Sequence, residues 1–280
     1  MSRLLLATAL ALLPLTAAAQ DRVLSIGGSV SEIVYALGQE GRLVGRDTTS
    51  TYPAAVEALP DVGYMRALSP EGVLSVSPDL ILMEAGAGPA ETLATLEGAG
   101  VKIVTIPGAD SPEGVEAKVQ AVAAALGQEA RGAELAARIE AETAAALATV
   151  AAQPGPKPRV LFVLGNSGGR LTGAGSDTSA AAMIALAGGV NAIEGFAGYK
   201  ALTDEAVAAA APDIILAMES SEGPGMPGDD PLYAHAALAA TPAGQAKRVV
   251  RMPGMFLLGF GPRTPEAILA LNAALYAKGN

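Results

Sequence analysis

The stretch LSPEGVLSVSPDLIL at residues 68–82 has a counterpart, LTDEAVAAAAPDIIL, at residues 202–216. The two align without gaps, and seven of the fifteen positions are identical. Each copy opens with a residue that favours helix N-caps, Ser69 or Thr203, followed by a carboxylate in the first turn, where the helix dipole favours negative charge. A Pro-Asp pair then stops the helix, and an apolar strand follows. Because this order occurs twice, we predict two similar lobes.

The same order of elements precedes each copy. The runs RVLSI (22–26) and RVLFVL (159–164) are short and apolar, and each leads through glycines into an apolar helical pattern. Those helical patterns end at Gly38 and at Gly188-Gly189. Apolar strands that alternate with helical periods indicate an α/β fold, and we expect each lobe to be Rossmann-like.

A long helix is predicted between the two copies. The segment from Gln128 is rich in helix formers, places Glu134 and Arg138 four residues apart, and closes on Pro154-Gly155-Pro156. A helix of about twenty residues is ~30 Å long, so we expect a rigid connector. We divide the chain into four parts: a signal peptide (1–19), an N-terminal α/β lobe (20–127), a connecting helix (128–156) and a C-terminal α/β lobe (157–280).

The first residues and the composition indicate an exported protein. MSRLLLATALALLPLTAAAQD combines one positive charge, an apolar run and closing alanines, which is typical of a secretory signal peptide cleaved after Ala19. The chain has no cysteine, so neither a disulfide nor a cysteine-linked lipid anchor is available. A formal net charge of −10 disfavours nucleic acid, which is bound through Lys and Arg. We therefore expect a soluble periplasmic protein.

Four segments carry a resemblance to a known family: residues 22–38, 59–82, 180–207 and 255–267. They resemble the solute-binding proteins of ABC importers that have one long interlobe helix (class III), and most closely the periplasmic haem-binding proteins. The resemblance implies a monomeric, non-enzymatic protein that captures haem, Fe(III) protoporphyrin IX, between its lobes. It also implies delivery to an inner-membrane ABC permease, with an outer-membrane haem receptor acting upstream.

The stretch VGYMRALS (62–69) supplies the candidate iron ligand. A phenol is a poor ligand at neutral pH unless it is assisted, and both Fe(III) and an adjacent cation favour its phenolate form. Arg66 follows Tyr64 by two residues, and side chains two apart in an extended loop point the same way, so the guanidinium is expected to reach the phenol. The resemblance likewise implies that Tyr64 binds the haem iron.

Further candidates lie in the second lobe. AGYKALTDE (197–205) echoes VGYMRALSPE (62–71) with one residue fewer, so Tyr199 and Lys200 are expected to face Tyr64 and Arg66. Tyr199 would be a second ligand, a stacking wall or a propionate donor, and Lys200 would neutralise a propionate. Arg263, in GFGPRTPEA, resembles a family motif. Candidate apolar walls are Met65, Met255, Phe256, Leu257 and Phe260, although for each of them taken alone a place in the core is the stronger expectation.

Two acidic residues are candidates for contact with the permease. Glu71 and Glu205 occupy matching positions of the repeat, and in this importer class the resemblance implies that one glutamate per lobe meets arginines of the permease. Stabilisation of the two helix starts is the alternative, and both roles are compatible.

The remaining sequence patterns are less specific for a function. The glycine-rich segment 165–175 reads as a loop that lacks the Walker lysine, and Asn166 and Ser167 stand where some haem-binding relatives have a histidine, which disfavours a second, His-ligated haem. The only histidine, His235, is predicted to lie on an alanine-rich helix, where iron ligation is the alternative to a structural role. Two other functions stay open: binding of cobalamin or a ferric siderophore, and an exported enzyme on the same scaffold, which lacks a catalytic or metal cluster.

Overall fold

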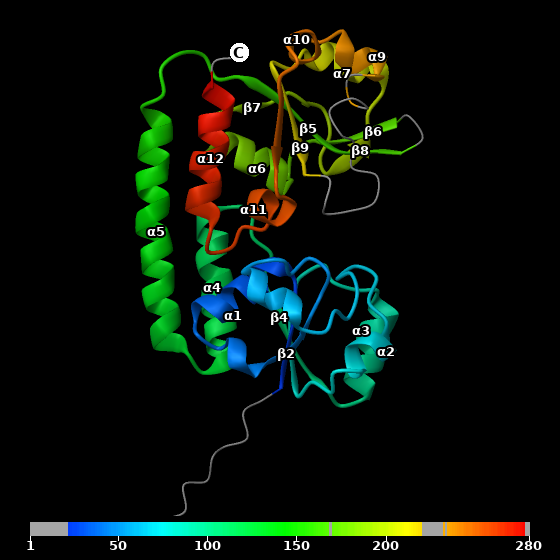
Figure 1. The fold of residues 1–280 in the computed structure, drawn as a ribbon, viewed down its shortest axis with the longest axis vertical. Coiled ribbons are helices and arrows are strands. Elements are labelled where there is room, and N and C mark those ends of the chain that lie inside the picture. Colours follow the sequence, from blue (N-terminus) through cyan, green and yellow to red (C-terminus); the bar gives the residue numbers. More distant parts are fainter. Residues whose placement is uncertain (1–21, 168–169, 220–231, 233, 278–280) are drawn as a thin grey trace, which may run out of the picture.

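Two lobes joined by one long helix make up the molecule (Figure 1). The structure, a computed structural model, describes residues 22–167, 170–219, 232 and 234–277. The predicted signal peptide lies outside these residues. Among the described helices, none combines the length and the apolar character needed to cross a bilayer.

The first lobe is built on a four-stranded parallel sheet in the order β2-β1-β3-β4. Its strands are β1 (Val23–Ile26), β2 (Leu43–Arg46), β3 (Leu80–Glu84) and β4 (Lys102–Ile106). Its helices are α1 (Gly28–Ala36), α2 (Pro70–Leu74), α3 (Ala90–Gly98) and α4 (Pro112–Leu126), with short 3-10 helices η1 (Glu40–Arg42) and η2 (Ala54–Ala58). The two central strands, β1 and β3, are almost wholly buried, as expected for a sheet covered on both faces.

The second lobe has a six-stranded sheet in the order β10-β9-β5-β6-β8, with β7 paired to β5. Its strands are β5 (Arg159–Ser167), β6 (Arg170–Ala174), β7 (Val190–Asn191), β8 (Tyr199–Ala201), β9 (Ile214–Met218) and β10 (Val249–Met252). The described helices are α6 (Ser179–Leu186), α7 (Asp204–Ala210), α9 (Ala236–Ala239), α10 (Pro242–Gln245), α11 (Gly254–Leu258) and α12 (Thr264–Tyr276).

The glycine-rich segment 165–175 is not a loop, and that expectation was wrong. Most of it lies in β5 and β6, which pair antiparallel with Asn166 opposite Leu171 and Gly165 opposite Thr172. Strand β8 adds to β6 in the same antiparallel sense. The backbone N–H and C=O groups pair in this ladder, which does not require large side chains. A glycine-rich sequence is therefore compatible with these strands, although it does not predict them.

The internal repeat is confirmed at the level of single hydrogen bonds. Ser69 and Thr203 cap α2 and α7 by accepting hydrogen bonds from the backbone N–H groups of Gly72 and Ala206. The Pro-Asp pair has the same task in both lobes. The carboxylates of Asp79 and Asp213 accept the backbone N–H of Arg22, just before β1, and of Arg159, the first residue of β5, at 3.0 and 2.8 Å. These bonds fix the register of β1 against β3 and of β5 against β9.

The connecting helix is α5 (Glu129–Ala151), which runs along both lobes in Figure 1. It ends five residues before the expected limit at 156, because Pro154 and Pro156 cannot continue a helix. It packs against α4 and α12. Gly132 leaves α4 and α5 in close contact at Ala123, where a Cβ would have no room. The division into lobes at residues 127 and 157 stays a prediction.

A second connection between the lobes is made by a fully buried lysine. Lys118 of α4 is 0% exposed, and its ammonium donates to the Glu84 carboxylate at 2.6 Å and to the Ser29 hydroxyl at 2.8 Å. Its third hydrogen bond, 3.1 Å long, goes to the carbonyl of Gly259, which follows α11. Since α11 packs on α6 and α12, one buried cation ties the carboxyl end of β3 to the second lobe.

Removing this cation is expected to destabilise the protein strongly. Lys118→Met keeps much of the side-chain volume but leaves the Glu84 carboxylate without its cation, which typically costs about 3–5 kcal/mol of unfolding free energy. Lys102→Met, on the exposed start of β4, is the matched control and should change the unfolding free energy by no more than about 0.5 kcal/mol. Urea denaturation measures both, and equal losses would contradict the interpretation.

Candidate ligand-binding site between the lobes

A tight turn after the bridge between Arg46 and Asp61 presents Tyr64. Gly63 adopts a φ of 104°, a conformation that favours glycine, and its N–H donates to the Asp61 carboxylate. The backbone N–H of Ala67 donates to the Tyr64 carbonyl at 2.8 Å and closes the turn. The side chain of Met65, between the two candidates, is buried and anchors the turn to the core.

Tyr64 and Arg66 do meet, although not through an extended loop. They are the first and third residues of the turn, and the Arg66 guanidinium donates to the Tyr64 phenolic oxygen at 2.8 Å. The Tyr64 side chain is 43% exposed. A phenol oxygen that already accepts from a permanent cation, and that remains open to solvent, is suited to act as an anionic ligand.

Tyr199 lies on the edge strand β8 and not in a loop as expected. Its ring packs edge-on against Phe162, with centroids 6.3 Å apart, and 40% of the residue is exposed. Burial raises the pKa of the Tyr199 phenol above its usual value, and the Ala180 backbone, the Thr178 hydroxyl and the charge of Arg66 offset this only in part. Arg66, in the turn of the first lobe, is therefore near enough for its charge to act on the Tyr199 phenol.

Lys200 follows on the same strand, with its ammonium 5.3 Å from the centroid of the Phe196 ring. Its side chain is exposed. Contact with an aromatic face holds the aliphatic part of a lysine while the charge stays in water. The cation is therefore available to an anionic group that enters beside Tyr199.

Arg263 is engaged within the protein to a degree that the sequence did not reveal. Its Nε donates to the Glu32 carboxylate at 2.9 Å, and a terminal nitrogen contacts the other carboxylate oxygen. The guanidinium carbon lies 3.8 Å from the centroid of the Tyr52 ring and 5.0 Å from that of Phe256. Glu32 is buried on α1, so this ion pair also joins the lobes.

Burial raises the pKa of Glu32, and the hydrogen bond and charge of Arg263 lower it in part. The Arg263 cation thus stabilises the Glu32 carboxylate against the cost of burial, and two of the guanidinium nitrogens are engaged in this pair. Tyr52, by contrast, is an exposed aromatic ring with one face backed by the guanidinium. Sequence reasoning missed Tyr52, for which the sequence offers no specific signal.

Most of the candidate apolar walls are core side chains. Met65, Leu257 and Phe260 are buried, so the expectation that each belongs to the core holds, and they leave almost no surface for a ligand. Met255 is partly exposed and lies against Gly28 at the start of α1, where a Cβ would meet its methyl group. Phe256, also partly exposed, packs on the main core.

His235 is not inside a helix. It is the N-cap residue of α9, and its Nε2 lies 3.8 Å from the Asp204 carboxylate at the start of α7.

The two candidates for contact with a permease, Glu71 and Glu205, are both exposed, each in the first turn of its helix. Hydrogen bonds to its own backbone N–H and to Thr203 hold the pKa of Glu205 below its usual value, so it is an anion at neutral pH. Among the described residues, no group of three acidic, histidine or cysteine side chains is arranged to hold a metal ion.

Comparison with protein families now decides the class. A family model described as "Periplasmic binding protein" matches residues 23–255, which include both sheets and α5. The chain belongs to this family. The two lobes and the single long helix between them are the arrangement expected for it.

Solved structures of family members superpose over most of the chain. The periplasmic heme-binding protein BhuT in complex with two hemes shares 46% identity at a TM-score of 0.85, covering 91% of this chain and 97% of that one. RhuT from Roseiflexus sp. RS-1, a periplasmic heme-binding protein in apo form, shares 39% at 0.87, covering 92% and 98%. A periplasmic heme binding protein from Pseudomonas aeruginosa shares 35% at 0.82, covering 93% and 94%.

Curated relatives match over shorter stretches. The uncharacterized ABC transporter substrate-binding lipoprotein YvrC of Bacillus subtilis is 26% identical over 197 residues, which cover 70% of this chain and 62% of that protein. The vitamin B12-binding protein of Yersinia pestis is 35% identical over 94 residues, 34% of each chain. The chain therefore spans less than two thirds of the length of these curated relatives.

The Arg263 pair gives a test of its structural role. Arg263→Lys keeps the charge but loses the planar fork and the stacking, so we expect the unfolding free energy to fall by about 1–3 kcal/mol. Arg170→Lys, at an exposed position, is the control and should stay within about 0.5 kcal/mol of the wild type. If Arg263→Lys proves as stable as this control, the pair does not hold the lobes together.

Proposed function

We propose that this periplasmic binding protein captures haem between its lobes and delivers it to an inner-membrane ABC importer. The observation that carries the proposal is the exposed Tyr64 phenol, whose oxygen accepts a hydrogen bond from Arg66. The heme-binding proteins BhuT and RhuT, which share 46% and 39% of their residues with this chain over nearly its whole described length, support the same ligand.

The chemistry of the Tyr64 turn suits ferric haem. A phenolate is a hard anionic oxygen ligand, which prefers Fe(III) to Fe(II), and tyrosine is an established axial ligand of haem iron. In the proposed complex Tyr64 ligates the iron from the first lobe, and Arg66 stabilises the negative charge on its oxygen. Oxidised haem outside the cytoplasm is therefore the cargo.

Tyr199 is the weaker candidate for the iron. Burial raises the pKa of its phenol, which disfavours the phenolate form, and no cation donates to its oxygen in the described part of the chain. We assign it to the facing wall, as a donor to a propionate or a stacking partner, with Lys200 neutralising a propionate. Tyr52, Met255 and Phe256 add further exposed or partly exposed surfaces next to Arg263 and α1.

Hemin titration followed by visible spectroscopy tests the iron ligand. Wild-type protein should give a tyrosinate-type ferric spectrum, and Tyr64→Phe should lose that spectrum and bind hemin at least about tenfold more weakly, or ~1.4 kcal/mol. Arg66→Met should weaken binding to a smaller extent. Tyr35→Phe, on the far end of α1, is the control and should match the wild type. A Tyr64→Phe protein with an unchanged spectrum would contradict the assignment of Tyr64 as the iron ligand.

Glu71 and Glu205 support the proposed contact with the permease. They occupy equivalent first-turn positions in the two lobes, both are exposed, and α2 and α7 lie away from α5 in Figure 1. Paired anions at fixed separation fit arginines on the two halves of a permease.

We further propose that residues 1–19 direct export to the periplasm. The mature protein is proposed to be a monomer without enzymatic activity, and an outer-membrane haem receptor is proposed to act upstream.

Transport into vesicles that contain the permease separates docking from haem capture. Glu71→Ala and Glu205→Ala should each lower ATP-driven haem transfer by about fivefold or more, because each removes an interfacial ion pair, while hemin titration stays unchanged. Glu57→Ala, an exposed change in η2, is the control for overall charge and should transfer haem like the wild type. Normal transfer by the double variant would exclude this docking mode.

A second candidate, cobalamin, has one observation in its favour, the match of 94 residues to a vitamin B12-binding protein. The match covers only about a third of the chain, whereas the heme-binding neighbours cover more than nine tenths. A ferric siderophore, usually anionic, would need more cations than this turn offers. Competition of hemin with cyanocobalamin and with a ferric siderophore decides among the three.

A further inference from the structure

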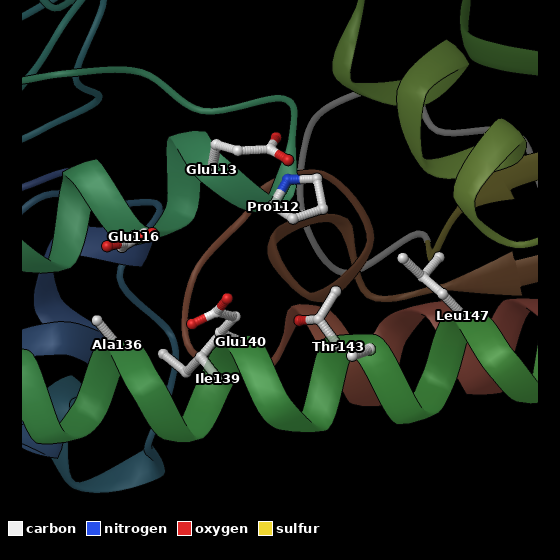
Figure 2. A pocket seen from close by; sticks show the side chains of 9 residues that line it. Pro112, Glu113, Glu116, Ala136, Ile139, Glu140, Thr143 and Leu147 are labelled. Atoms are coloured by element: carbon white, nitrogen blue, oxygen red, sulfur yellow. The ribbon is translucent and has the colours of Figure 1, made fainter.

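Exposed aromatic side chains are few in this protein, and tyrosine supplies them. Of the five large hydrophobic side chains that are exposed in the described part of the chain, three are tyrosines: Tyr52, Tyr64 and Tyr199. The hollow between α4 and α5 offers no such surface, because none of the described residues that line it is aromatic (Figure 2). Tyr64 and Tyr199 already have roles in the proposed haem site, and Tyr52 is the one without a role.

Tyr52 lies in the loop that follows β2, at the carboxyl edge of the first parallel sheet. The loop is held by Asp47, which is wholly buried and whose carboxylate accepts from the backbone N–H of Gly27 and from the Ser50 hydroxyl, both at 2.9 Å. In open α/β sheets, ligands bind outside this carboxyl edge of the strands. The position of Tyr52 is therefore one from which a ligand is usually contacted.

The loop of Tyr52 is also joined directly to the turn that presents Tyr64. The backbone N–H of Thr48 donates to the carbonyl of Gly63 at 3.1 Å, and the Thr48 hydroxyl donates to the Asp61 carboxylate at 3.2 Å. Gly63 is the residue before Tyr64. The two exposed phenols of the first lobe thus stand on neighbouring loops that are hydrogen-bonded to each other.

The ring of Tyr52 is oriented by the second lobe. The guanidinium carbon of Arg263 lies 3.8 Å from the ring centroid, and the guanidinium is itself bound through two nitrogens by Glu32. A cation over the face of an aromatic ring is attracted by the ring quadrupole, so the contact fixes the plane of the ring. Tyr52 is nevertheless 47% exposed, so a large part of it stays open to solvent where the lobes meet.

An open aromatic ring with a fixed plane suits a flat aromatic ligand. Aromatic rings attract each other in offset-stacked arrangements beyond the effect of the area that they bury. A ring that is already oriented loses little freedom when the ligand arrives. A porphyrin offers a continuous aromatic face to such a ring, whereas the partly saturated corrin of cobalamin does not.

We propose that Tyr52 is a stacking platform for the porphyrin and favours it over chelates that lack a flat aromatic face. This inference rests on the haem-binding function proposed above. Tyr52 and Tyr64 approach the same face of the porphyrin from the first lobe, with Tyr64 at the iron and Tyr52 over the rim. Arg263 acts as a positioning residue, because its guanidinium sets the plane of the Tyr52 ring.

Titration with hemin and with metal-free protoporphyrin IX separates the platform from the iron ligand. The metal-free ring cannot be ligated by Tyr64, so its affinity depends on the walls alone. Tyr52→Leu should weaken the binding of both rings by about three- to tenfold and leave the tyrosinate-type spectrum of bound hemin unchanged. Tyr64→Phe should weaken hemin only. Tyr52→Phe keeps the aromatic ring and should restore the affinity for both.

Controls distinguish stacking from a general loss of apolar surface or of stability. Leu269→Ala removes another exposed apolar side chain, on α12, and should bind both rings like the wild type. Urea denaturation of each variant reports any purely structural effect, which would lower the midpoint without changing the affinity for protoporphyrin IX. If Tyr52→Leu does not fold, Arg263→Lys decides, because loss of the stacked guanidinium should weaken protoporphyrin IX by about twofold or more.

Three results would overturn the platform: a folded Tyr52→Leu that binds protoporphyrin IX as tightly as the wild type, a Tyr52→Phe that binds it as weakly as Tyr52→Leu, or, where Tyr52→Leu does not fold, unchanged binding by Arg263→Lys. Failure of the iron-ligand assignment looks different. In that case wild-type protein lacks the tyrosinate-type spectrum with hemin, while Tyr52→Leu still weakens protoporphyrin IX.

Discussion

A single buried cation fixes how the two lobes sit. The Lys118 ammonium is removed from water, so it must find partners, and it finds them on two elements of the first lobe and on the carbonyl of Gly259. Moving the lobes apart would leave the Lys118–Glu84 pair intact within the first lobe but would break the hydrogen bond from the ammonium to the Gly259 carbonyl. This hydrogen bond adds to the connection that α5 makes between the lobes.

The geometry of the candidate site depends on these connections. Tyr64 and Tyr199 belong to different lobes, so their relative placement depends on how the lobes are held. The ion pair between Glu32 and Arg263, one helical turn after Ser29 on α1, adds a second contact between the lobes. A binding protein whose lobes are held in this way presents a preformed surface, which lowers the cost of ordering the site when a ligand binds.

The two tyrosines illustrate how surroundings separate similar residues. Both stand in related sequence contexts and both are about two-fifths exposed. Arg66 donates directly to the Tyr64 oxygen, while Tyr199 packs against Phe162 and partial burial raises the pKa of its phenol. The repeat therefore supplied two phenols, and local packing gave them different chemistry.

The sequence by itself determined the repeat, the caps at Ser69 and Thr203, the strands that follow each Pro-Asp pair and the existence and start of α5, because these depend on neighbours a few residues apart. It also brought Tyr64 and Arg66 together, since both lie in one turn. The partners of Arg263 and Lys118 were decided only by the tertiary structure. A charged residue in an apolar helix, such as Glu32 or Lys118, indicates that a partner exists. The partner of Glu32 lies 231 residues away in the sequence, and one partner of Lys118 lies 141 residues away. Local sequence patterns do not extend over such separations, so they cannot identify these partners.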